Sequence, residues 1–305
     1  MLNKSLIGLI VCFLFVTEGE AQRWKKYRQE LTFGAGTTWL LGDVGGFGDE
    51  PTNTIADINF AETSWGITAG YNYYLTKNIS VNGQFMYGWF EANDKHADNE
   101  ARKHRNFDIR THIYELGITG RYYFIKEKFG HAFRLKGAQS GFLYGLSAYV
   151  TTGITGFYYN PKGRYSPSGK YESLRPIGTE GQTVDTSGLS PYGKFSMAIP
   201  LGLGVKYALG TRWNVGAEIM FRKSFTDYLD DVSTDYYDNQ AIIDANDGNL
   251  EAGLLADPAD KTGDQAHWTN AGEARGGPKY DDFYMTFMFT LSYKILKGKS
   301  FKPRF

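Results

Sequence analysis

The sequence predicts an all-β protein, an eight-stranded antiparallel transmembrane barrel of the outer-membrane class. Three observations predict it: segments of alternating apolar and polar residues, a chain rich in aromatic residues (16%) and glycine (37), and an N-terminal export signal. Alternation is clearest in 282–295, DFYMTFMFTLSYKI. At about 3.3 Å per residue this segment spans roughly 45 Å. A tilted strand needs only about 9–11 residues to cross the hydrocarbon of a membrane.

The first 21 residues have the pattern of a secretory signal peptide. Lys4 precedes an apolar run at 6–16, and small residues follow at Gly19 and Ala21. The run is too short to span a bilayer as a helix. The single cysteine, Cys12, lies inside it, and Val11 before it disfavours a lipid anchor. We therefore expect a signal peptide at 1–21 and one barrel domain at 22–305.

The first half of the chain holds four segments with apolar residues at every second position. They are 30–41 with Phe33 and Trp39, 64–76 with Ile67 and Tyr71, 79–90 with Val81 and Phe85, and 109–124 with Leu116 and Ile118. Only Lys77 and Asn78 separate the second segment from the third. That spacing is typical of a tight β-hairpin.

The second half holds four more segments of the same kind. They are 142–159 with Val150 and Ile154, 194–209 with Leu201 and Leu203, 213–225 with Val215 and Ile219, and 282–295 with Phe287 and Phe289. No segment repeats another, and no second domain is indicated. Eight strands complete the predicted barrel.

The connections between these segments alternate in length. Residues 77–78 and 210–212 are short, whereas 42–63, 160–193 and 226–280 are long. Bacterial barrels place short turns in the periplasm and long loops outside the cell. An even number of strands then puts both termini in the periplasm.

Charged residues are interspersed on the face opposite the apolar sets. Charges that face lipid are costly, so we expect these to point into the lumen. The interior of an eight-stranded barrel is just wide enough for its own side chains, which predicts a plugged lumen. The expected ladder of lumen ion pairs consists of Glu30, Glu115, Arg121, Lys206, Glu218, Arg222 and Lys294.

The expected periplasmic end is basic, although the chain has no net charge. One interpretation is anchoring to lipid headgroups. The other is docking of an acidic periplasmic partner, which the length of connection 125–141 favours. The residues of this docking surface would be Arg23, Lys25, Lys26, Arg28, Lys126, Lys128, Arg134 and Lys136.

No catalytic pattern stands out. The five histidines show no spacing to a serine and an acid that would suit nucleophilic catalysis. The acidic run 227–235 could offer oxygen ligands to calcium, but it lacks the glycine-centred spacing of a helix–loop–helix site. We interpret it as a solvated loop and expect no metal, no cofactor and, given the location, no nucleic acid.

Several short motifs, in this order, resemble one known family. They are WKKYR at 24–28, LLGDVGG at 40–46, FTDYLDDVS at 225–233, ARGGP at 274–278 and LSYK at 291–294. The sequence resembles the PorG family, small outer-membrane barrels of the Bacteroidetes type IX secretion system. Related Bacteroidetes barrels share the TDYLDDVS segment.

The resemblance implies a non-enzymatic part of an export machine. Its expected partners are the periplasmic ring proteins, PorK-like and PorN-like, and the translocon nearby, in an environment of outer-membrane lipid and lipopolysaccharide. The alternative is a stand-alone structural or adhesive barrel that acts through its extracellular loops. An outer-membrane enzyme is the third hypothesis.

Overall fold

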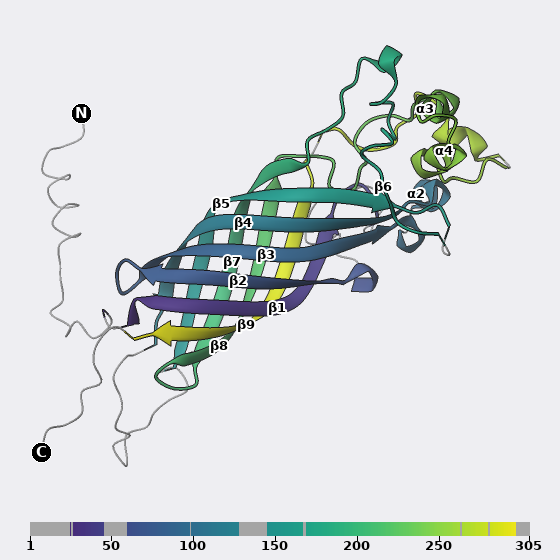
Figure 1. Ribbon diagram of the computed structural model, residues 1–305. Helices are drawn as coiled ribbons and strands as arrows, with labels where there is room; N and C mark the ends of the chain where they lie inside the picture. The colour runs from purple at the N-terminus through teal and green to yellow at the C-terminus, as the bar shows by residue number, and fades with distance from the viewer. Residues whose placement is uncertain are drawn as a thin grey trace, which may run out of the picture.

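The computed structural model describes residues 25, 27–45, 60–97, 99–127, 145–166, 169–262, 264–279 and 281–296. Eight antiparallel strands follow one another around a closed sheet in the order β4-β3-β2-β1-β9-β8-β7-β5, and β5 pairs back with β4. Figure 1 shows the resulting cylinder, in which the first strand begins and the last strand ends at one end, here called the terminal end, and the helices lie at the other. The predicted fold class is confirmed.

The strands lie close to the expected segments. Their bounds are β1 Gln29–Leu41, β2 Ser64–Tyr74, β3 Ile79–Asn93, β4 Asp108–Ile125, β5 Leu146–Gly163, β7 Phe195–Ala208, β8 Trp213–Ser224 and β9 Phe283–Ile295. The expected end of the fifth strand at residue 159 is wrong. Pairing with β4 continues as far as Gly163 opposite Ile109. The two-residue strand β6, Glu172–Ser173, pairs with Lys162 and Gly163 at the end of β5. Residues 142–144, the expected start of the fifth strand, lie outside the described residues.

Strands β1 and β9 close the barrel. They pair without a break from Gln29 opposite Ile295 to Leu41 opposite Phe283. The two backbones approach closely at Gly36, where an added Cβ would lie 1.9 Å from the carbonyl oxygen of Phe287. Closure at this position therefore requires glycine.

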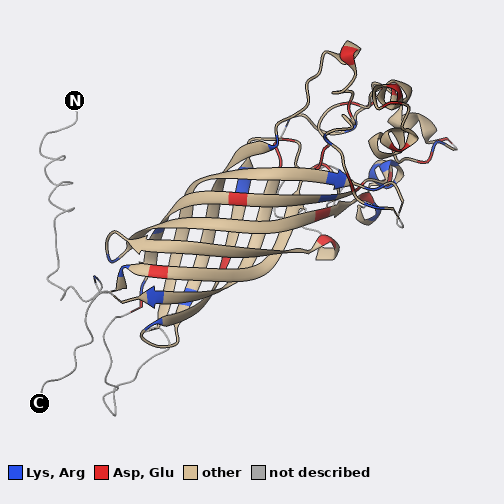
Figure 2. Ribbon diagram, in the orientation of Figure 1, with Lys and Arg blue, Asp and Glu red and all other residues tan. Residues whose placement is uncertain are grey.

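The outer surface of the barrel is apolar. Large side chains that point outward along the strands stay exposed, including Phe33, Ile67, Leu116, Ile118, Leu201, Leu203 and Phe289. Figure 2 shows few charged positions along the strands, and more of them near the two ends. An apolar barrel wall of this kind suits contact with lipid.

The C-terminal end of β1 departs from simple alternation of exposed and buried residues. Trp39 and Leu41, expected on the outer face, are buried. The ring of Phe60 packs edge-on against Trp39 at 6.4 Å, and Trp39 Nε1 donates a hydrogen bond to Thr63 Oγ1. The segment after β1 therefore covers this part of the barrel wall.

The helices gather at the end opposite the start of β1 and the end of β9 (Figure 1). They are α2 Glu100–Arg105, α3 Asn239–Ala245 and α4 Leu250–Ala256, with short 3₁₀ turns at Phe60–Glu62, Asp94–His96, Asp185–Ser187 and Ala266–Thr269. Asn99, Asp238 and Asn249 cap the three α-helices by accepting backbone N–H bonds. Among the described residues, none of the helices is long and apolar enough to span a membrane.

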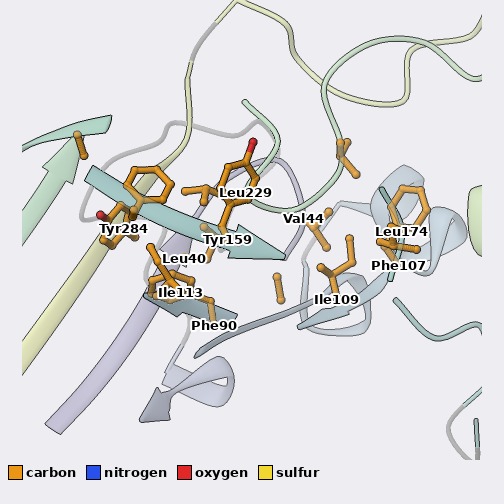
Figure 3. Close-up of a cluster of buried hydrophobic side chains, with 14 of the residues drawn as sticks. Leu40, Val44, Phe90, Phe107, Ile109, Ile113, Tyr159, Leu174, Leu229 and Tyr284 are labelled. Carbon is orange, nitrogen blue, oxygen red and sulfur yellow. The ribbon is translucent and has the colours of Figure 1, made fainter. Parts of the chain in front are cut away.

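The main hydrophobic core fills the barrel mouth at the helical end (Figure 3). Strand residues such as Phe90, Ile113 and Tyr284 meet loop residues such as Val44 and Leu229 there. A smaller cluster of Tyr74, Tyr123 and Tyr149 lies toward the other end. Side chains thus pack inside the barrel near both of its ends.

Candidate functional site: the lumen and the two ends of the barrel

The charged residues of the strands meet in pairs inside the barrel. Lys206 Nζ lies 2.8 Å from Glu30 Oε1, Arg121 Nη2 lies 2.8 Å from Glu218 Oε2, and Arg222 Nε lies 2.7 Å from Glu115 Oε2. All six side chains are buried. The members come from strands far apart in sequence, so the pairs tie the barrel wall across its interior.

Lys294, the seventh residue of the expected ladder, pairs with Glu127. Glu127 is not predicted as a lumen residue by the alternating pattern, because it follows the end of β4. Glu127 N also donates to Ser147 Oγ, and the Glu127 side chain is buried. The only available signal was its place as a lone acid beside basic residues.

Tyrosine hydroxyls complete the ion pairs. Tyr149 OH donates to Glu218 at 2.6 Å, Tyr284 OH donates to Glu115 at 2.5 Å, and Tyr74 OH donates to Glu30 at 3.1 Å. Each buried carboxylate therefore has both a cation and a hydroxyl partner, which offsets the cost of removing it from water. These hydroxyl partners are not predictable from the alternation, because tyrosines occur on both faces of the strands.

The expected docking surface is only partly described. Arg23, Lys26, Lys128, Arg134 and Lys136 lie outside the described residues. Lys25 is exposed, whereas Arg28 is half-buried and donates to Tyr73 OH at 3.4 Å.

Lys126 turns toward the lumen. Its Nζ lies 4.4 Å from the centre of the Tyr74 ring and 5.8 Å from that of Tyr123. Burial lowers the pKa of Lys126 to about 7. Lys126 therefore belongs to the interior packing more than to an exposed docking surface.

The acidic run 227–235 is not the solvated loop that the sequence suggested. Asp230 and Asp231 are fully buried, together with Leu229 and Val232 on either side of them. Asp230 accepts hydrogen bonds from Val44 N at 3.0 Å and Val232 N at 3.1 Å. The apolar members carry the run into the barrel mouth, and its carboxylates bond to backbone N–H groups there.

Two buried arginines hold the loops together at this mouth. Arg275 pairs with Glu180 at 3.0 Å, and Arg105 pairs with Asp94 at 2.9 Å. Both guanidinium groups contact the ring of Phe107, at 4.6 Å for Arg275 and 5.1 Å for Arg105. This arginine–phenylalanine contact joins segments that are far apart in the chain.

Glu180 extends the same network. Its Oε1 accepts hydrogen bonds from Ser233 N at 2.8 Å and Thr234 N at 3.0 Å. Arg105 also donates to the carbonyl oxygens of Asp43 and Arg275, at 2.7 Å each. Sequence reasoning assigned no role to Glu180 or Arg105, and Arg275 appeared only within the motif ARGGP.

Asp230 and three other acids at the mouth have raised pKa values. Burial, followed by the neighbouring acids, raises the pKa of Asp230 to about 7 and holds that of Asp282 well above its ordinary value. Burial also raises the pKa of Asp43, and it raises that of Asp227 to about 8. Within the described ranges, no three or more His, Cys, Asp or Glu side chains form a metal-binding group.

The histidines take part in separate contacts. The Tyr87 hydroxyl lies 3.2 Å from His112 Nδ1, His96 Nδ1 lies 3.6 Å from Glu62, and the His104 ring packs edge-on against Trp268. His131 lies outside the described residues. These contacts are those of packed or surface side chains.

A family model described as "Domain of unknown function (DUF6089)" matches residues 4–174. No curated protein matches the chain.

Solved structures of small outer-membrane barrels are similar to the chain at low identity. Ail of Yersinia pestis is 9% identical with a TM-score of 0.36, covering 87% of this chain and 97% of its own. Neisserial surface protein A is 8% identical with a TM-score of 0.35 (87% and 96% covered), and outer membrane protein W of E. coli is 16% identical with a TM-score of 0.32 (88% and 98% covered). What this chain does must be argued from its own residues.

Proposed function

The chain belongs to the family of the domain of unknown function DUF6089, and from that premise we propose that it is a non-enzymatic outer-membrane component of type IX secretion. In this proposal residues 1–21 are a signal peptide that is removed, and both termini face the periplasm. There the barrel holds the periplasmic ring of PorK-like and PorN-like proteins against the membrane, near the translocon. The motifs at 24–28, 40–46, 225–233 and 274–278 support this assignment.

The observation that carries the proposal is the difference between the two ends of the barrel. At the helical end the buried arginines pair with buried acids, as Arg275 does with Glu180. At the terminal end the exposed charges described are basic, and they include Lys25, Lys77 and Arg212. A basic surface would attract and orient an acidic periplasmic partner.

The interior supports a structural role over a transport role. The ion pairs Lys206–Glu30, Arg121–Glu218 and Arg222–Glu115 are buried within the barrel. An interior of this size is filled by such side chains. We propose that the lumen is plugged and passes no solute.

Affinity purification tests the proposal. The tagged full-length barrel would be purified from gently solubilised outer membranes of its native host, and the ring lipoprotein quantified by mass spectrometry. Reversal of Lys25, Lys77 and Arg212 to Glu should reduce the recovered ring protein at least fivefold. The matched control reverses Lys95 and Lys103, which are exposed at the opposite end, and should leave recovery unchanged. If the barrel comes alone and type IX cargo is still secreted by a deletion strain, the proposal is wrong.

The second candidate function is a stand-alone structural or adhesive barrel. Leu250 and Leu254 of α4 remain 69% and 46% exposed in the loop layer at the helical end, where an apolar partner could bind. Replacing both by Ser should then abolish surface adhesion and leave secretion intact. Loss of secretion without loss of adhesion would exclude this candidate.

A further inference from the structure

Two buried carboxylates converge beside Gly42 at the barrel mouth. Gly42 follows directly after β1, Asp230 lies in the inserted run 227–235, and Asp282 immediately precedes β9. The position that a Cβ on Gly42 would occupy lies 2.6 Å from Asp230 Oδ2 and 2.7 Å from Asp282 Oδ1. Because residue 42 is glycine, no side chain occupies the position between Asp230 Oδ2 and Asp282 Oδ1.

One of these oxygens has no hydrogen-bond partner. Asp282 is 1% exposed, and its Oδ2 accepts from Leu229 N at 2.8 Å, yet its Oδ1 is buried and unbonded. Oδ2 of Asp227, in the same inserted run, is also buried and unbonded. An unsatisfied buried carboxylate oxygen is costly, so a ligand for it is expected.

The acids beside Gly42 also have no ion-pair partner among the described residues. The nearby arginines are engaged elsewhere, Arg105 with Asp94 and Arg275 with Glu180 and Asp231. Of the ion pairs formed between described residues, none includes Asp43, Asp227, Asp230 or Asp282. Buried charges are normally paired, bound to a metal or neutralised by a proton.

We propose that Asp230 and Asp282 bind a single Ca²⁺ ion beside Gly42. Both side-chain donor atoms are carboxylate oxygens, which select a hard cation over zinc or copper. Calcium takes six to eight oxygens in irregular geometry, so backbone carbonyl oxygens and water would complete the coordination. The bound ion would hold the 227–235 run against the ends of β1 and β9. This inference is independent of the secretion role.

Calorimetric titration with CaCl2 tests the proposal on the full-length barrel, purified in detergent and stripped with EGTA. The wild type should bind one ion and unfold several degrees higher in CaCl2 than in EGTA. Asp282→Asn and Gly42→Ala should each weaken binding at least tenfold. The glycine variant keeps every charge and only places a methyl group between Asp230 Oδ2 and Asp282 Oδ1. Asp235→Asn, which alters an exposed acid of the same run, should bind like the wild type.

Two results would overturn the proposal. One is a wild type whose heat of titration and unfolding temperature do not respond to CaCl2, a test that needs no variant to fold. The other is equal calcium binding by wild type, Asp282→Asn and Gly42→Ala. If Asp282→Asn instead stabilises the barrel while calcium does not, a shared proton neutralises the pair, and no cation site exists.

Discussion

Arg275 and Glu180 form a fully enclosed ion pair at the barrel mouth, with Nη1 of Arg275 3.0 Å from Oε1 of Glu180 and neither side chain exposed. The pair joins the end of the connection between β8 and β9 to the long connection between β5 and β7. Because Arg275 also donates to the carbonyl oxygen of Asp231, the same contact holds the acidic run inside the mouth. The loop layer therefore depends on a few buried polar contacts.

Removing one member of this pair should strongly destabilise the loop layer. Glu180→Ala leaves the guanidinium of Arg275 buried without its main partner, which costs about 3–5 kcal/mol. Protease cleavage within 226–280 should become faster while the barrel itself stays folded. As a control, Glu100→Ala removes the exposed pair with Lys103 and should cost less than about 1 kcal/mol. Equal protease resistance in Glu180→Ala and the wild type would contradict this prediction.

Breaking a lumen pair should destabilise the whole barrel. Lys206→Met leaves Glu30 buried with only hydrogen-bond donors, and the expected loss is about 3–5 kcal/mol. Adding Glu30→Gln removes the uncompensated charge and should restore part of the loss. Urea unfolding, followed by the heat-dependent gel shift of folded barrels, measures both effects. A double variant less stable than Lys206→Met would argue against charge as the cause.

Glycine at position 36 should be essential for closure. Alanine would place a Cβ 1.9 Å from the carbonyl oxygen of Phe287, whereas a Cβ at Gly83 in β3 meets nothing within 4 Å. Gly36→Ala should thus prevent or greatly slow barrel folding into detergent micelles, and Gly83→Ala should fold like the wild type. Similar folding yields for the two variants would show that β1 and β9 can separate enough to admit the methyl group.

A charge on the outer face should be tolerated according to its depth. Leu201, in the middle of β7, is 58% exposed, and Leu209, in the turn after β7, is 62% exposed. Arginine at a bilayer midplane costs about 2–4 kcal/mol, but only about 0–1 near the interface. Leu201→Arg should therefore lower stability in phospholipid vesicles much more than Leu209→Arg. Equal losses would mean that this wall does not face hydrocarbon.

The mouth acids should make calcium-free stability fall between pH 5 and pH 7. The raised pKa of about 8 for Asp227 and about 7 for Asp230, against an ordinary value of 3.8, means that the folded state keeps protons that the unfolded chain releases. Stability present at low pH is then lost as the pH rises toward those values. Lys126, with its pKa lowered to about 7, acts in the opposite sense only above that pH. Urea unfolding in EGTA should show a smaller decline for Asp227→Asn, and an identical decline would be inconsistent with this assignment.

Whether an outward-facing strand residue is exposed depends on its position along the strand. Residues such as Leu201 and Leu203 alternate without interruption, and they face outward as expected. Trp39 and Leu41 continue the same alternation but are buried, and for Trp39 the cover is Phe60 and Thr63. Alternation reports which face a side chain is on, but it does not report what later covers that face.

The acidic run shows the same limit at the candidate site. Asp230 and Asp231 look solvated when composition alone is considered. They are buried because Leu229 and Val232 anchor the run in the core and because backbone N–H groups and Arg275 meet the carboxylates there. Those partners come from loops whose positions no local pattern describes.

The alternation along the chain is sufficient to predict the closed barrel and the face on which each strand residue lies, because a period of two separates the side chains whatever surrounds the strand. Which charges form pairs depends on the way in which the strands and loops assemble. Lys206 pairs with Glu30, which is 176 residues away in the sequence, and Asp282 and Asp230 both lie beside Gly42. Such pairings depend on strand register, on the stagger of the closed sheet and on where the loops enter its mouth, all of which are set by contacts between distant segments.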